Sequence, residues 1–221
     1  MAESILTALF KPDEFFEEQS KKEASLSIPL GIICVYALLS GIAGYQMAVL
    51  MAPMYEIIAE GYGEIIAIFG AIGGFIGAAL TWVVVSVIFF LLSMLFRGEG
   101  SMKKVLEAVG YGFTPLIAVA GIGVVYLAMI ADQIQVTVVH DIMDPGAIEA
   151  AMGEFMAQPA MQEYTLLITV ISVIFFIWAA NIWYFGIRHA RNLTARDAGI
   201  TVLIPVAIYL IFIIITSGVF V

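Results

Sequence analysis

The chain has 221 residues, of which 62% are hydrophobic, and its mean hydropathy is +1.06. These values lie outside the range of soluble globular domains, so the apolar residues are predicted to be buried in a lipid bilayer. The net charge is −9 and no basic patch stands apart from acidic residues, which excludes nucleic acid as an expected partner.

Residues 1–27 are predicted to form a lead-in on the cytoplasmic side of the membrane. Lys11 is followed by Pro12 and two acidic residues, a pattern typical of a helix N-terminus. The favoured interpretation is a short amphipathic helix on the membrane surface, with Phe15 and Phe16 facing inward. A docking surface for a cytosolic protein is the alternative. No pattern of a cleaved signal peptide precedes it.

Five stretches are long and apolar enough to cross a bilayer, which takes about 20 helical residues. They are residues 28–52, 65–96, 108–131, 165–187 and 199–221. The second is longer than a bilayer requires, so it is expected to tilt or to continue beyond the membrane as helix. The sequence therefore predicts an all-α, single-domain bundle of five transmembrane helices, with one long outer loop at residues 132–164.

All Lys and Arg residues of the chain fall on one side of these five stretches. They are Lys11, Lys21, Lys22, Arg97, Lys103, Lys104, Arg188, Arg191 and Arg196. The connections 53–64 and 132–163 contain none. This distribution predicts a cytoplasmic N-terminus and an external C-terminus for a multi-pass protein of the cell membrane.

Small residues recur along the second stretch and partly along the first. They are Gly70, Gly73, Gly74, Gly77 and Ala78 in the second stretch, and Gly41 and Gly44 in the first. Removing side chains at four-residue spacing lets two helix backbones approach closely, which favours helix association in lipid. We expect these residues to pack inside the bundle, with a homo-oligomer interface as the alternative.

Prolines interrupt the third and fifth stretches. Pro115 has no backbone donor and disfavours helical geometry at the preceding residue, so the third helix is expected to kink or to start late. Pro205 predicts a second kink. Kinked helices line a cavity or gate in some membrane proteins, but a rigid bundle is the favoured interpretation.

Ionisable residues at membrane depth, which mark many transport pathways, are almost absent from the five stretches. Asn181 is predicted to be the most buried polar group, with Gln46 near the outer end of the first stretch. Both are expected to form hydrogen bonds between helices. In the outer loop, residues 146–158 carry apolar side chains at helical spacing, which predicts an amphipathic helix.

Motifs for enzyme chemistry or metal binding are not found. The outer loop holds His140, Asp141 and Asp144, but their spacing fits no ligand pair, so no metal or other cofactor is predicted. The HExxH and GxSxG motifs are absent, as is a paired nucleophile and base. No enzymatic activity is expected.

Residues 97–115, with the sequence RGEGSMKKVLEAVGYGFTP, combine a Gly-rich turn, a Ser, an amphipathic stretch and Gly110-Tyr111 followed by Pro115. This pattern resembles the signature of the Yip (Ypt-interacting protein) family. Residues 9–16, LFKPDEFF, are similar to the lead-in of prokaryotic members. The resemblance implies a five-span membrane domain with a cytoplasmic N-terminus.

Eukaryotic members of that family bind small prenylated GTPases and act in vesicle trafficking and membrane shaping. This chain lacks their long acidic cytosolic domain and their Asp-Leu-x-Gly-Pro motif, so a GTPase partner is not expected. Our hypothesis is a non-enzymatic membrane scaffold that packs with other membrane proteins or with itself. The alternative is a small channel, transporter or lipid-moving protein with a cavity at the third and fifth spans.

Overall fold

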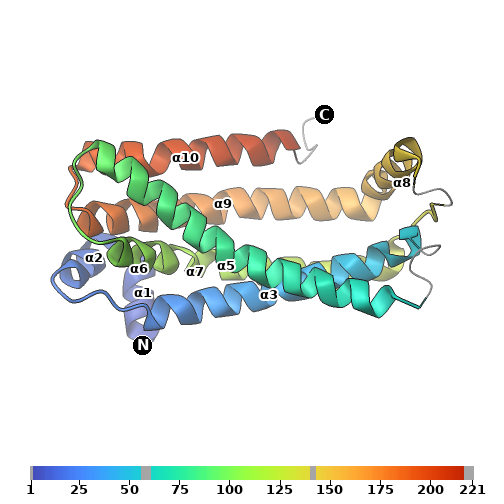
Figure 1. The fold of residues 1–221 in the computed structure, drawn as a ribbon, viewed down its shortest axis with the longest axis horizontal. Coiled ribbons are helices and arrows are strands. Elements are labelled where there is room, and N and C mark those ends of the chain that lie inside the picture. Colours follow the sequence, from blue (N-terminus) through green and yellow to red (C-terminus); the bar gives the residue numbers. More distant parts are fainter. Residues whose placement is uncertain (1, 56–60, 140–142, 217–221) are drawn as a thin grey trace.

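The computed structural model describes residues 2–55, 61–139 and 143–216. Within these ranges the chain is helical and contains no strand. Five helices there are long and apolar enough to cross a membrane: α3 (Ser27–Met51), α5 (Gly63–Leu95), α7 (Thr114–Ile130), α9 (Pro159–Ala190) and α10 (Ala195–Thr216). The predicted all-α bundle of five membrane-spanning helices is therefore confirmed (Figure 1).

Shorter helices cover the two ends of this bundle. One end carries α1 (Ala2–Phe10), α2 (Pro12–Ser20) and α6 (Met102–Gly112), and the other carries η1 (Ala52–Tyr55), η2 (Ala131–Gln133) and α8 (Pro145–Ala157) (Figure 1). Because every Lys and Arg lies near the first end, we call it the basic end and the other the acidic end. α2 begins at Pro12, as the sequence predicted.

The long second span crosses the bundle obliquely. α5 has 33 residues, which correspond to about 50 Å of helix at 1.5 Å per residue. It lies along α3 towards the acidic end and reaches α10 at the basic end (Figure 1). The excess length is thus used to tilt α5 across its neighbours, which is one of the two arrangements expected from its length.

The third span begins later than the stretch 108–131. The chain ends α6 at Gly112 and starts α7 at Thr114, with Pro115 in the first turn of α7. Residues 108–112 belong to α6, which packs against α9, α5 and α3. Proline is tolerated in a first turn, where its missing N–H has no partner to lose. The late start was one of the two outcomes expected of Pro115.

Two apolar clusters form at the ends of the bundle. The larger lies at the basic end and joins α1, α2 and α6 to the spans, with Phe16, Val105, Trp183 and Ile187 among its buried members. The smaller lies at the acidic end, where α8 and residue 139 cover the end of α3. Along the spans, many large apolar side chains face outward, as a surface in contact with lipid requires.

Candidate functional site: the signature segment and the cavity beside it

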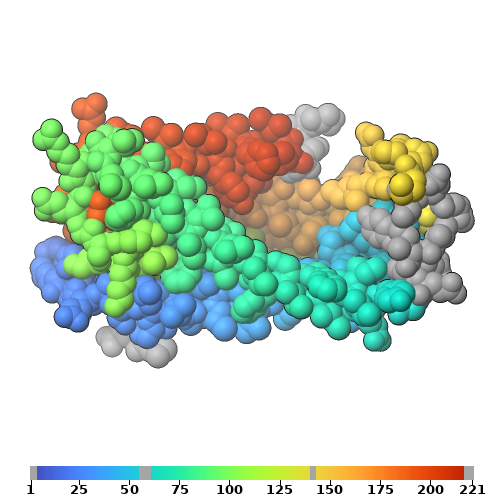
Figure 2. All heavy atoms as spheres, viewed as in Figure 1, coloured from blue at the N-terminus to red at the C-terminus, as the bar shows by residue number. Residues whose placement is uncertain are grey.

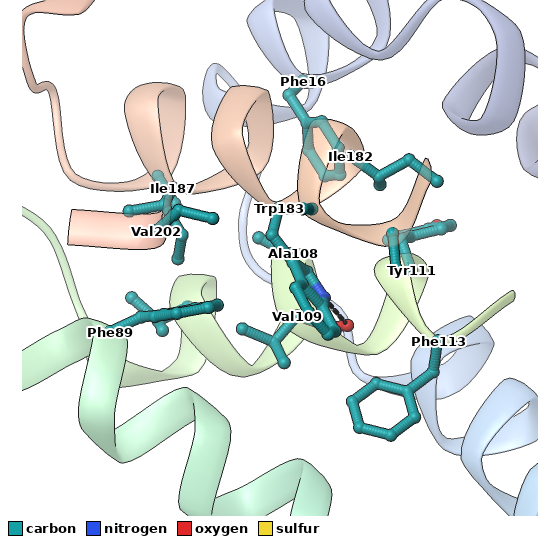
Figure 3. Close-up of a cluster of buried hydrophobic side chains, with 14 of the residues drawn as sticks. Phe16, Phe89, Ala108, Val109, Tyr111, Phe113, Ile182, Trp183, Ile187 and Val202 are labelled. Atoms are coloured by element: carbon teal, nitrogen blue, oxygen red, sulfur yellow. Dashed lines mark hydrogen bonds between the residues drawn. The ribbon is translucent and has the colours of Figure 1, made fainter. Parts of the chain in front are cut away.

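The break between α6 and α7 turns two aromatic residues in different directions. Ser101 caps the start of α6, with its hydroxyl accepting from the Lys104 amide at 3.4 Å. Tyr111, in the last turn of α6, is buried against α2, whereas Phe113, which directly follows α6, is buried among the membrane spans. Figure 3 shows both side chains leaving the α6–α7 segment towards different neighbours. The signature segment therefore connects the basic-end helices to the interior of the bundle.

Tyr111 forms an aromatic cluster with α2. Its ring centroid lies 4.9 Å from that of Phe15 and 6.0 Å from that of Phe16, both in edge-on geometry. Burial raises the pKa of the Tyr111 hydroxyl, the Glu107 charge adds to this, and a hydrogen bond with Ser4 opposes it. Phe15 and Phe16 thus pack against Tyr111 within the protein, and the position of α2 on the membrane surface stays a prediction.

Glycines allow the close packing of α6 on its neighbours. A Cβ at Gly112 would overlap the indole of Trp183, and one at Gly110 would lie 2.6 Å from the Pro29 side chain. On the opposite helix, a Cβ at Gly186 would lie 2.9 Å from that of Ala108. The two glycines that flank Tyr111, Gly110 and Gly112, thus stand at positions of α6 that have no room for a side chain.

All three tryptophan indoles donate hydrogen bonds to backbone carbonyls of the basic-end helices. Trp82 donates to Leu106 at 3.0 Å, and Trp183 donates to Val109 at 2.9 Å. Trp178 donates to Leu9 of α1 at 3.0 Å. Figure 3 shows the Trp183 bond as a dashed line at the centre of the cluster. These bonds attach α1 and α6 to the spans α5 and α9.

A buried carboxylate lies beneath α2. Glu107 is 4% exposed, and its Oε1 accepts from Gln19 Nε2 at 2.8 Å and from the Ser25 amide at 3.3 Å. Burial raises the pKa of this carboxyl group, although the two hydrogen bonds and the nearby Lys104 and Lys103 lower it in part. Glu107 therefore connects α6 to both α2 and the start of α3.

Arg191 is a structural residue that the sequence reasoning assigned only to the positive side of the membrane. Its guanidinium is buried, with Nε donating to Ser93 Oγ at 2.8 Å and its two terminal nitrogens donating to the carbonyls of Gly98 and Gly100. The group also lies 4.4 Å from the ring centroid of Phe90. Burial lowers the pKa of this guanidinium. Arg191 thereby fixes the glycine-rich turn between α5 and α6.

The glycine-rich turn itself explains why a buried arginine is needed there. Gly100 has a positive φ of 111°, and so does Arg97 with 56°. These conformations bend the chain into a turn in which the carbonyls of Gly98 and Gly100 both accept from Arg191. The Arg-Gly-x-Gly sequence indicates a turn with open carbonyls. Nothing in the sequence shows which distant basic side chain donates to those carbonyls.

α2 is also held by an ionic contact with the end of α9. Asp13 Oδ1 lies 2.6 Å from His189 Nε2 and 3.5 Å from a terminal nitrogen of Arg188. The fold brings α2 onto the last turn of α9, so His189 faces a carboxylate.

Two of the small residues of α5, Gly70 and Gly74, lie against α3. A Cβ at Gly74 would overlap the Ser40 carbonyl, one at Gly70 would lie 2.6 Å from the Gly44 carbonyl, and one at Gly41 would lie 3.0 Å from the carbonyl of Ala71. Ala78, further along α5, is buried. Gly73 and Gly77 have open space around them and face outward. The homo-oligomer alternative remains a prediction for those two positions.

The two polar residues expected at membrane depth differ in their surroundings. Gln46 lies between α3 and α7, where its Nε2 donates to the Val124 carbonyl at 3.2 Å. Asn181 is exposed beside α10, so the prediction that it is the most buried polar group is wrong for this chain. Its neighbours Ala180 and Ile182 are buried, and one step of 100° around α9 turns Asn181 outward. The apolar sequence around it does not reveal which side faces protein.

A cavity of about 160 Å³ lies beside the signature segment, between α5 and α10. Residues of all five spans and of the α6–α7 break line it: Tyr36, Thr81, Val85, Ile88, Phe89, Phe113, Leu116, Phe176, Trp183, Pro205, Val206 and Tyr209. Pro205 lies inside α10, which continues through it. None of the lining residues is charged, so the cavity suits apolar groups.

Of the three outer-loop residues considered as metal ligands, His140 and Asp141 lie outside the described residues. Asp144 caps the start of α8, with its Oδ1 accepting from the Gly146 amide at 2.9 Å. Among the described residues no group of three or more His, Cys, Asp and Glu is arranged to hold a metal ion.

The fold and the signature segment define a polytopic helical membrane protein whose basic end is closed by three short helices. The chain belongs to the family described as the Yip1 domain, which matches residues 6–216. An uncharacterized protein of Methanocaldococcus jannaschii is 37% identical over 117 residues, which make up 52% of this chain and 81% of that protein. No solved structure gives a significant match. The resemblance inferred from residues 97–115 is thus confirmed.

Proposed function

We propose that this chain is a non-enzymatic membrane scaffold that presents the acidic face of α2 to a protein partner. The observation that carries this proposal is the orientation of α2. Its phenylalanines are turned into the bundle and Asp13 contacts His189, so the helix is held in place. Its remaining acidic residues, Glu14, Glu17 and Glu18, are exposed.

The charge of this surface indicates the chemistry of the partner. α2 contains four acidic residues and no basic one. The ion pairs Lys11–Glu14 and Lys21–Glu17 are exposed, and such pairs contribute about 0–1 kcal/mol, so the carboxylates are available for stronger contacts. We propose a partner with a basic surface, because complementary charge speeds association and selects against acidic proteins.

The side of the membrane follows from the distribution of basic residues. Short loops that carry Lys and Arg stay on the cytoplasmic side of the membrane, and here all of these residues lie at the basic end. We therefore place α2 in the cytoplasm and the protein in the cell membrane. A scaffold in this position connects a cytosolic protein to the bilayer.

In-cell photo-crosslinking tests this proposal. A photoreactive amino acid replaces Glu18 on α2 or, as the matched control, the exposed Glu149 on α8 at the acidic end. We expect a specific protein adduct from position 18 and no such adduct from position 149. The adduct from position 18 should disappear when Glu14→Lys and Glu17→Lys are added. Identical adducts from both positions, or no protein adduct from position 18, would contradict the scaffold.

A second function, the handling of a lipid, is favoured by one observation: the uncharged cavity between α5 and α10. Ion and proton pathways are lined by backbone carbonyls, rings of charged side chains, or chains of Asp, Glu and His, and the residues that line this cavity include no Asp, Glu, His, Lys or Arg. Within the transport alternative, the cavity therefore supports an apolar cargo rather than an ion.

A further inference from the structure

We infer that the cavity between α5 and α10 binds one hydrocarbon chain of a bilayer lipid. This site goes beyond the scaffold role and does not depend on it, because the cavity lies among the membrane spans whereas the proposed partner contacts α2. The inference rests on the buried inner wall of the cavity, on its opening at the surface of the spans, and on its almost entirely apolar lining.

The inner wall of the cavity is made of buried side chains. Phe113 and Trp183 are 1% exposed and Phe89 is 2% exposed. The rings contact one another, with centroids 5.8 Å apart for Phe113 and Trp183 and 5.7 Å for Phe89 and Trp183. These side chains come from three separate segments, so the wall is a fixed part of the bundle rather than a surface depression.

The outer rim of the cavity faces the surface of the spans. Ile88 on α5 is 40% exposed and Tyr209 on α10 is 46% exposed. α10 packs mainly along α9 and touches α5 less, and Figure 2 shows the surfaces of α5 and α10 parting, with α9 visible between them. In a membrane-spanning bundle this opening leads sideways into the hydrocarbon region, where the available molecules are lipid chains.

Water is a poor occupant of this space. A buried water needs two to four polar partners. The Thr81 hydroxyl already donates to the Gly77 carbonyl at 2.8 Å, the Trp183 indole donates to Val109, and the Tyr36 hydroxyl is hydrogen-bonded with Ser40. The hydroxyl of Tyr209, which is 46% exposed, is the remaining side-chain polar group of the lining. The rest of the lining is almost entirely aliphatic or aromatic. An empty space would instead lose the dispersion contacts of its walls, so a chain that enters from the bilayer stabilises the bundle.

The size of the cavity fits a chain segment and excludes a headgroup. An engineered apolar cavity of about 150 Å³ in another protein binds benzene, so this cavity holds a segment of roughly six carbon atoms. A charged headgroup inside it would lose its hydration with no charged partner among the lining residues. The chain therefore enters by its apolar part and the headgroup stays outside.

Quenching of Trp183 by brominated lipid tests the inference in the full chain. Trp82→Phe and Trp178→Phe leave Trp183 as the one tryptophan, and the protein is placed in phosphatidylcholine vesicles with dibrominated acyl chains. Bromine quenches indole fluorescence at short range. Val206→Phe fills the cavity from α10, and we expect it to reduce the quenching of Trp183 by at least about twofold. Equal quenching with and without Val206→Phe would overturn the inference.

Two controls separate this effect from a general change of the protein. In a variant that retains Trp178 alone, which does not line the cavity, quenching should be the same with and without Val206→Phe. Should Val206→Phe fail to fold, Val85→Phe fills the cavity from α5 instead. Native mass spectrometry of the unmodified protein, released in mild detergent, should show one retained lipid that Val85→Phe removes. A wild-type spectrum without lipid would overturn the inference.

Discussion

At the scale of single residues, the polar groups of the basic end are paired mainly with backbone atoms. Arg191 donates to two carbonyls and a serine, and Glu107 accepts from an amide and from Gln19. Leaving such a buried group without its partner costs about 1–3 kcal/mol. Each pairing therefore restrains the short helices and turns to one arrangement on the spans.

Arg191→Leu should destabilise the protein by about 3 kcal/mol, because it leaves the carbonyls of Gly98 and Gly100 and the hydroxyl of Ser93 unpaired. Thermal unfolding in detergent micelles measures the effect. The matched control is Arg196→Leu, at an exposed position, which should change stability by no more than about 0.5 kcal/mol. Equal losses in both variants would contradict the role assigned to Arg191.

Glu107 should make stability depend on pH. Its pKa is raised in the folded state from the ordinary value of 4.5, so the folded chain holds this proton more tightly than the unfolded chain does. The resulting stabilisation is fully present below pH 4.5 and is lost as the pH rises through the folded-state pKa. Melting temperatures across this window should fall less in Glu107→Gln than in the wild type. Glu99→Gln, at an exposed site, should retain the wild-type slope.

At the scale of elements, the closest helix pair is α3 and α5. Their glycines at positions 41, 44, 70 and 74 meet backbone to backbone, and any side chain there would overlap a carbonyl or come within about 3 Å of one. Such contacts supply dispersion energy in lipid, where burial of apolar surface provides no driving force between helices. α3 lies on the side of the bundle opposite α10, and α5 crosses from α3 to α10 (Figure 1).

Gly74→Leu should destabilise the bundle by about 2–3 kcal/mol, since the added side chain must push α5 away from the Ser40 carbonyl. Gly73→Leu is the matched control, one residue away on the same helix, with open space around it. Thermal unfolding and size-exclusion chromatography in detergent compare the two. Unchanged stability in Gly74→Leu would show that this contact does not hold the bundle together.

At the scale of the whole molecule, an apolar cluster closes each end of the bundle. The basic end is closed by aromatic side chains and paired polar groups, and the acidic end by α8 over a methionine-rich cluster. The cavity lies among the spans, where α5 crosses from α3 to α10. The oblique path of this long helix thus coincides with a lateral space between α5 and α10.

The orientation of the molecule is tested by cysteine labelling of intact cells. In a Cys34→Ala background, a single cysteine replaces Glu149 on α8 or Glu18 on α2. A membrane-impermeant maleimide should label position 149 directly and position 18 only after permeabilisation, because Lys and Arg are retained in the cytoplasm. Labelling in the reverse order would invert the proposed topology.

The predictability of the fold differed between features of the chain. Apolar runs identified all five spans, and residues 146–158 anticipated α8 to within one residue at each end. Pro115 showed where the third span is interrupted. The assignment of residues 108–112 to α6 could not be predicted. An apolar segment of this kind has the same composition whether it belongs to a membrane span or to a buried helix outside the span.

The packing of residues around the candidate site was harder to predict from the sequence. The stripes Gly70–Gly74 and Gly73–Gly77 look alike in the sequence, yet the first meets α3 and the second faces outward. Asn181 was assigned to the interior and lies at the surface. In a helix that is apolar all around, the pattern carries no signal for which face meets protein and which meets lipid.

By itself, the sequence determined the class of the protein, the number of spans, and the family, because these follow from the free energy of placing apolar helices in lipid and from one local motif. Only the tertiary structure decided that α2 docks on α9, that Arg191 binds a turn formed by residues nearly 100 positions earlier, and that five spans leave a cavity between α5 and α10. These features depend on contacts between segments far apart in the chain, whose geometry is set by the packing of the whole bundle.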